Sequence, residues 1–193
     1  MSLDDLGVQG EPVEDGLTFE TNARIKARFA ARATGLPALA DDSGLEVDAL
    51  GGAPGVRTRR YAGPEATDAE NNAKLRRELD GVPAEARSAR YVCVLALAIP
   101  DASALGGVRL ITRRGTSRGR IALEPRGSAG FGYDPLFEPA RERPGGRTFG
   151  QYEPAEKDAI SHRGRAARRM APVLRELAGA PAEAPPPGQE PAI

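Results

Sequence analysis

The sequence predicts an α/β domain with a mixed β-sheet, and three observations lead to this prediction. Helix-like and strand-like segments alternate along the chain, which favours a sheet covered by helices. Residues 88–99 are apolar almost without interruption, as is typical of a strand buried on both faces. The chain has 193 residues, 40% of them hydrophobic, which is enough for one domain with a sizeable core.

The first helix is expected over residues 18–34, with Thr18 as a typical N-cap residue. Residues 1–17 before it carry turn-forming and acidic residues and no periodic pattern. Because Thr18, Asn22 and Lys26 are four residues apart, they share one face of this helix.

A short strand and a second helix are expected next. The apolar run 36–40 predicts a strand that ends abruptly at the Asp-Asp-Ser-Gly turn of residues 41–44. Thr67 and Glu70 have the spacing of a capping box, so they predict the start of a helix that Gly81 closes.

Three strands are expected in the second half of the chain. The buried strand 88–99 is followed by strand-like segments at residues 108–112 and 119–123, which we expect to form a hairpin. A glycine-rich segment follows at residues 125–135.

The last helix is expected to begin at Asp158 or Ser161 and to reach about residue 177, with a kink at Pro172. The folded domain therefore spans residues 1–177. The tail, residues 178–193, is rich in proline, alanine and glutamate, and we expect it to be disordered.

The composition excludes several classes of protein. Basic and acidic residues number 27 each, so no net charge points to a nucleic-acid polymer or an anionic membrane as partner. The single cysteine, Cys93, excludes a disulfide scaffold and a cysteine-ligated zinc site, and it is expected to be a small buried hydrophobe. The sequence has neither an apolar stretch of membrane-spanning length nor a signal peptide, so a cytoplasmic location is expected.

Lysine is scarce in this chain. Of the 27 basic residues only Lys26, Lys74 and Lys157 are lysines, and the others are arginines. This pattern suggests a coding bias that replaces lysine wherever chemistry permits. Each remaining lysine is therefore a candidate for a specific role.

Two clusters in the first quarter of the chain could bind a metal ion and phosphate. The adjacent carboxylates of Asp41 and Asp42 repel one another, and a divalent cation would relieve that cost. The alternatives are an Asx turn and a solvated acidic loop. Glu14 precedes Lys26 by twelve residues, and lysine offers a compact charge for a phosphate. The alternative is a solvated helix lysine.

Two further clusters could bind a flat, anionic ligand. Phe131 lies between two glycines, which let a ligand approach the backbone, so its ring could stack on a base. The alternative is a plain turn. Lys157, His162 and Arg163 lie near the start of the last helix, an arrangement that favours anions or oxo groups. The alternative is simple capping by Ser161 with exposed charges.

In this order, the segments resemble those of the inosine triphosphate pyrophosphatase family, the XTP/dITP diphosphatases that remove deaminated purine nucleotides. The resemblance runs from about Asp5 to Leu177. It is carried by residues 14–23 with Lys26, 40–55, 59–63, 130–135 and 156–164.

This resemblance implies an elongated, mixed sheet flanked by helices, with two lobes around a nucleotide cleft and usually a homodimer. It implies Mg²⁺-dependent hydrolysis of non-standard purine nucleoside triphosphates (XTP, ITP, dITP) to the monophosphate and pyrophosphate, a house-cleaning role in the nucleotide pool. Two alternatives stay open: a catalytically impaired nucleotide-binding remnant of the same fold, and a Maf-like nucleotide pyrophosphatase.

The resemblance also implies roles for individual residues. Glu14 and Asp42 would bind Mg²⁺ with support from Asp41, and Asp42 would also act as the general base for the attacking water. Lys26, a catalytic candidate, and Lys157 would contact the triphosphate. The substrate-binding residues would be Ser43, Phe131, Gly132, Tyr133, Asp134, Lys157, His162 and Arg163.

The selectivity for deaminated purines has a simple chemical basis. Hypoxanthine and xanthine present an acceptor, O6, where adenine presents a donor amine. A pocket of donors, such as His162 and Arg163, would leave those donors unpaired against adenine, which can give roughly 10⁴-fold discrimination.

The sequence departs from the family pattern at three places. The family's opening strand and Thr-x-Asn-x-x-Lys loop have no match here. The explanation we expect is a start codon placed too late, and the alternatives are a truncated or a degenerated protein. Thr21 stands where the family often has an acid. The segment 57–60, Arg-Thr-Arg-Arg, is more basic than the usual Ser-Ala-Arg.

Overall fold

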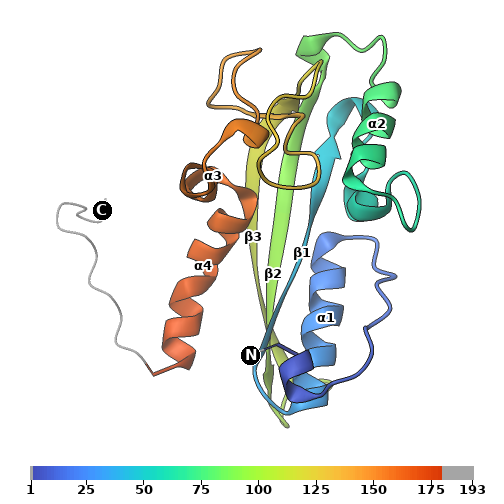
Figure 1. Ribbon diagram of the computed structural model, residues 1–193. Coiled ribbons are helices and arrows are strands. Elements are labelled where there is room, and N and C mark those ends of the chain that lie inside the picture. The colour runs from blue at the N-terminus through green and yellow to red at the C-terminus, as the bar shows by residue number, and fades with distance from the viewer. Residues whose placement is uncertain (1, 180–193) are drawn as a thin grey trace, which may run out of the picture.

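The computed structural model describes residues 2–179. They form a four-stranded sheet in the order β1-β2-β3-β4, with helices on both faces (Figure 1). The strands are β1 (Ala38–Val47), β2 (Ser88–Pro100), β3 (Val108–Ile121) and β4 (Phe137–Pro139). The helices are α1 (Phe19–Thr34), α2 (Asp68–Glu78), α3 (Pro154–Ile160) and α4 (His162–Leu177).

Strand β2 lies at the centre of three layers and is buried on both faces, which confirms the interpretation of its apolar sequence. Figure 1 shows α1 and α4 on opposite sides of the long strands. Because side chains alternate along a strand, even positions of β2 such as Val92 and Val94 pack against α1. Odd positions such as Leu95 and Leu97 pack against α4, and Cys93 lies fully buried among them.

A third hydrophobic cluster lies where α2 and β4 meet the ends of β1 and β2. It contains Leu45 and Leu75 together with the packed rings of Tyr91, Phe137 and Phe149. This cluster anchors α2 and the segment after β4, both of which carry contacts to the candidate site described below.

Two strand predictions were wrong, and both for the same physical reason. Strand β1 does not end at residue 40 but continues through residues 41–44, because each of them pairs with β2. Strand β3 is one continuous strand rather than a hairpin, since its residues pair with β2 from end to end. Pairing with another strand thus outweighs local turn-forming residues.

The helix starts at Thr18 and Thr67 are confirmed. The hydroxyl of Thr18 accepts a hydrogen bond from the backbone N–H of Thr21, and the Thr67 capping box is formed. Helix α2 ends at Glu78, three residues before Gly81, so that its expected end was wrong.

The last helix begins at His162 with Ser161 as its N-cap and contains Pro172, while the short helix α3 before it was not expected. Helix α4 packs very closely on β3. A Cβ atom on Gly115 would lie 2.1 Å from the carbonyl oxygen of His162, so glycine is required for this approach. We expected a disordered tail at residues 178–193, and residues 180–193 of it lie outside the described residues.

All three strand pairings in the described residues are antiparallel, and the parallel pairing of a mixed sheet is not among them. The expected α/β layering of a sheet between flanking helices is confirmed. In residues 2–179, no helix combines the length and apolar character that crossing a membrane requires.

Candidate active site

The adjacent carboxylates of Asp41 and Asp42 point to opposite faces of the sheet. This follows from their place inside β1, where successive side chains alternate. The expectation that residues 41–44 form a turn was therefore wrong. Each carboxylate instead belongs to a different cluster of polar side chains, one on the α1 side and one on the α4 side.

On the α1 side, Lys26 lies between two carboxylates. Its Nζ is 2.8 Å from Oδ1 of Asp42 and 3.2 Å from Oε2 of Glu14. The amide of the buried Asn22 donates to Oδ2 of Asp42 at 3.4 Å and accepts from the backbone N–H of Gly16 at 2.8 Å. The structure thus confirms that Asn22 and Lys26 share a face, and it brings Glu14, Lys26 and Asp42 together.

Partial burial sets the charges of this cluster. Burial raises the pKa of Asp42, although the ammonium of Lys26 acts in the opposite direction. Burial also opposes the charge on Lys26, but Asp42 and Glu14 outweigh it and raise the pKa of the ammonium. The result is a carboxylate that is more basic than an exposed one, beside a lysine that stays protonated.

The donor set of this cluster fits Mg²⁺. Magnesium binds proteins through one or two carboxylates and completes its octahedron with water and substrate phosphates. Glu14 and Asp42 provide two carboxylates within reach of one Lys26 ammonium. Within residues 2–179 no group of three or more His, Cys, Asp or Glu side chains is gathered, so a protein-only cage is not formed there.

On the α4 side, Asp41 joins β1 to the start of α4. Its Oδ2 accepts from the hydroxyl of Ser43 at 2.7 Å and from Nη2 of Arg163 at 3.0 Å. Burial opposes the charge, but Ser43 and Arg163 hold the pKa of Asp41 below its usual value. Asp41 thus fixes the guanidinium of Arg163 through Nε and Nη2. The third nitrogen, Nη1, forms no hydrogen bond with any described residue.

The glycine-rich loop presents Phe131 next to these groups. The ring is 58% exposed, and the cationic groups of Lys157 and Arg163 lie 4.7 and 5.6 Å from its centre. Beneath it the buried carboxylate of Asp134 pairs with Lys157 and accepts from the N–H of Phe131 at 2.8 Å. A Cβ on Gly130 would overlap that carboxylate, so the turn requires glycine.

Lys157 lies in α3 and packs against the Phe131 loop. Its contacts are the Asp134 carboxylate and the rings of Phe131 and Phe149. That Lys157 contacts the triphosphate stays a prediction.

Helix α2 holds the loop by two side chains that sequence reasoning missed. The N–H of Gly132 donates to Oδ2 of Asp68 at 2.6 Å, and the amide of Asn72 donates to the carbonyl of Gly132 at 2.8 Å. The neighbouring Tyr133 is buried, and its hydroxyl donates to the carbonyl of Thr58 at 2.7 Å. The sequence shows that Asp68 and Asn72 are four residues apart and so share a helix face. It does not show their partner, Gly132, which lies 60 or more residues away.

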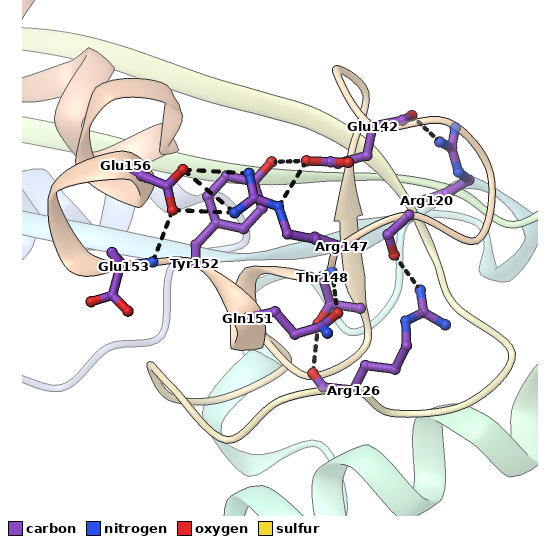
Figure 2. A network of polar contacts seen from close by, with 10 residues as sticks. Arg120, Arg126, Glu142, Arg147, Thr148, Gln151, Tyr152, Glu153 and Glu156 are labelled. Atoms are coloured by element: carbon purple, nitrogen blue, oxygen red, sulfur yellow. Dashed lines mark hydrogen bonds and ion pairs between the residues drawn. The ribbon is translucent and has the colours of Figure 1, made fainter.

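A network of charged side chains holds the other side of the loop (Figure 2). The hydroxyl of Thr148 donates to the carbonyl of Arg126 at 2.6 Å, and Arg126 pairs with the buried Glu138. Arg147 lies between Glu142 and Glu156, and the ring of Tyr152 packs under its guanidinium. These contacts tie the start of the loop to the segment between β4 and α3.

His162 lies behind this surface, at the first position of α4. Its ring is 4% exposed and stacks on Tyr91 at 4.7 Å. Burial, with the positive charges of Arg163 and Lys157, lowers the pKa of His162 to about 3. The imidazole is therefore neutral at physiological pH, and its buried Nδ1 has no hydrogen-bond partner in the described residues.

A groove of about 620 Å³ runs beside the cluster on the α1 side. Glu14 and Lys26 line it together with Asp41, residues 36–40 and Arg59. It gives an elongated anionic ligand a path along the exposed edge of β1.

Comparison with known proteins gives relatives over most of the chain. The model of the Ham1 family matches residues 1–173. A dITP/XTP pyrophosphatase of Syntrophobacter fumaroxidans is 56% identical over 164 residues, which are 85% of this chain and 66% of the relative. One from Mycolicibacterium paratuberculosis is 52% identical over 180 residues, which are 93% of this chain and 84% of the relative.

Solved structures agree with this result. A HAM1 protein from Coxiella burnetii is 46% identical, with a TM-score of 0.80 over 90% of this chain and 84% of its own. The Ham1 protein of Staphylococcus aureus is 35% identical, with a TM-score of 0.82 over 92% of this chain and 86% of its own. The family model and both structures lead to one conclusion: this chain belongs to the Ham1 family.

Proposed function

We propose that this chain hydrolyses non-standard purine nucleoside triphosphates, with dITP and XTP as substrates, to the monophosphate and pyrophosphate. Relatives that are 56% and 52% identical to it over the aligned residues are dITP/XTP pyrophosphatases. The observation that carries the proposal is the Lys26 ammonium between Glu14 and Asp42, beside a groove of nucleotide size. Because the chain belongs to the Ham1 family, we do not pursue the alternative of a Maf-like nucleotide pyrophosphatase.

The phosphate end of the substrate would lie at the α1-side cluster. Mg²⁺ held by Glu14 and Asp42 would supply positive charge to the phosphate oxygens. Asp42 would accept a proton from the water that attacks the α-phosphorus. Lys26 would keep Asp42 oriented, and Asn22 fixes the second oxygen of the same carboxylate.

The base would lie on the α4 side, stacked on the exposed ring of Phe131. Arg163 is held over this ring by Asp41, and its Nη1 is available as a donor to O6 of hypoxanthine or xanthine. The exocyclic amine of adenine would face this donor without forming a hydrogen bond. His162 is neutral and buried, so its part is to support the ring of Tyr91 and the start of α4 rather than to add charge.

Pyrophosphate release tests the proposal. The wild-type chain with MgCl2 is assayed on dITP, XTP and dATP, and kcat/KM for dITP is expected to exceed that for dATP by about 10²-fold or more. An Arg163→Gln variant should lose most of this preference while still turning over dITP. Equal kcat/KM values for dITP and dATP would contradict the proposed selectivity, and binding without turnover would support the remnant alternative.

The resemblance also leads us to propose a homodimer and a cytoplasmic location. Both stay predictions. Sedimentation of the purified chain at several concentrations tests the dimer.

A further inference from the structure

Arg59 belongs to the unusually basic segment 57–60, and its position in the structure gives it a specific environment. It lines the same groove as Glu14 and Lys26, although it comes from the 3₁₀ helix Gly55–Arg60 and not from α1. Its side chain is exposed and forms no hydrogen bond or ion pair with any described residue.

The charge balance of this groove leaves room for a further cation. The one ammonium on the α1 side, that of Lys26, is already paired with both Glu14 and Asp42. Asp41 also borders the groove, but its carboxylate lies on the α4 side, where it is paired with Arg163. A pyrophosphate or triphosphate group carries several negative charges, so an unpaired guanidinium in the groove has an evident use. Guanidinium groups bind phosphate oxygens through two parallel hydrogen bonds.

Helix α2 fixes the backbone that carries Arg59. The buried amide of Asn71 donates to the carbonyl of Arg59 at 2.9 Å and accepts from the N–H of Ala62 at 2.8 Å. The ammonium of Lys74 donates to the carbonyl of Tyr61 at 2.7 Å and lies over its ring. The segment is therefore anchored at three backbone groups while the guanidinium of Arg59 stays available.

We infer that Arg59 is a phosphate-binding residue of this site, which contacts the pyrophosphate portion of the nucleotide rather than its base. The inference rests on the proposed function. It also gives Lys74 a role, because that lysine positions the segment and does not itself contact the phosphates.

Calorimetric titration tests the inference with two probes, Mg²⁺-pyrophosphate and dIMP. The Arg59→Gln variant is expected to raise the Kd of pyrophosphate about tenfold and to leave the Kd of dIMP within twofold. Arg59→Lys should recover part of the loss. The matched control is Arg57→Gln. It removes the same charge at a position two residues from Arg59, and Arg57 lines a different groove.

Steady-state kinetics give a second readout. For Arg59→Gln we expect KM for dITP to rise about tenfold with kcat within threefold of wild type, and the increase to shrink at high salt. Equal pyrophosphate affinity in Arg59→Gln and Arg57→Gln would overturn the inference, as would an equal loss for dIMP. A wild type that binds pyrophosphate through Arg59 but does not hydrolyse dITP would support the inference and contradict the proposed function.

Discussion

The single histidine of this chain is expected to make the fold sensitive to mild acid. His162 is stacked on Tyr91 and nearly inaccessible to water, and its pKa in the folded state is lowered to about 3. In the unfolded chain the same imidazole has a pKa of about 6.5. Between these values the unfolded state binds one proton more than the folded state, so stability falls as the pH is lowered from about 6.5 toward 3.

The size of the effect follows from the pKa difference. Each pH unit below the unfolded pKa costs about 1.4 kcal/mol, so at pH 5 protonation of the unfolded imidazole lowers the free energy of unfolding by about 2 kcal/mol relative to pH 8. Below about pH 3 the folded state also binds the proton, and the loss stops growing.

Two measurements check this prediction. Between pH 8 and pH 5, urea unfolding should show that the free energy of unfolding falls by about 2 kcal/mol in wild type and by much less in His162→Asn. Because the variant keeps all the carboxylates, it separates their pH dependence from that of the imidazole. NMR follows the imidazole directly, because only one histidine signal exists. A folded protein whose signal titrates near pH 6.5, or equal pH dependence in both proteins, would refute the reasoning.

Two substitutions test the packing. Gly115→Ala places a Cβ against the carbonyl of His162 and the N–H of Ala166, so it should lower the free energy of unfolding by about 3 kcal/mol, and an unchanged urea midpoint would contradict this close approach. Asp134→Ala leaves the Lys157 ammonium, which is 14% exposed, without its carboxylate. It should cost roughly 3 kcal/mol in urea unfolding. A variant as stable as wild type would show that the pair contributes nothing to holding the loop.

The local part of the site could be predicted from the sequence. Asn22 and Lys26 are four residues apart on a helix that begins at a recognisable N-cap, so their shared face follows from helix geometry. The contact of Lys26 with Glu14 does not, because Glu14 lies in the loop before that helix. The helix N-terminus after Ser161 was found in the same way. The glycines around Phe131 suggested either a base-stacking loop or a plain turn, and in the structure both glycines have a left-handed backbone.

The parts that depend on distant partners could not be predicted. Residues 41–44 have the composition of a turn, and only the pairing with β2 makes them a strand and separates Asp41 from Asp42. The contacts of Asp68 and Asn72 with Gly132 join segments about 60 residues apart.

The most direct test of the account compares the two adjacent carboxylates. Asp42 contacts Lys26 on the α1 side, whereas Asp41 holds Arg163 on the other side of the sheet. In a pyrophosphate-release assay with saturating dITP and Mg²⁺, Asp42→Asn should lower kcat by about 100-fold or more, because it loses the base. Asp41→Asn should keep kcat within about tenfold of wild type. Wild-type turnover by Asp42→Asn would contradict the central claim that this carboxylate activates the water.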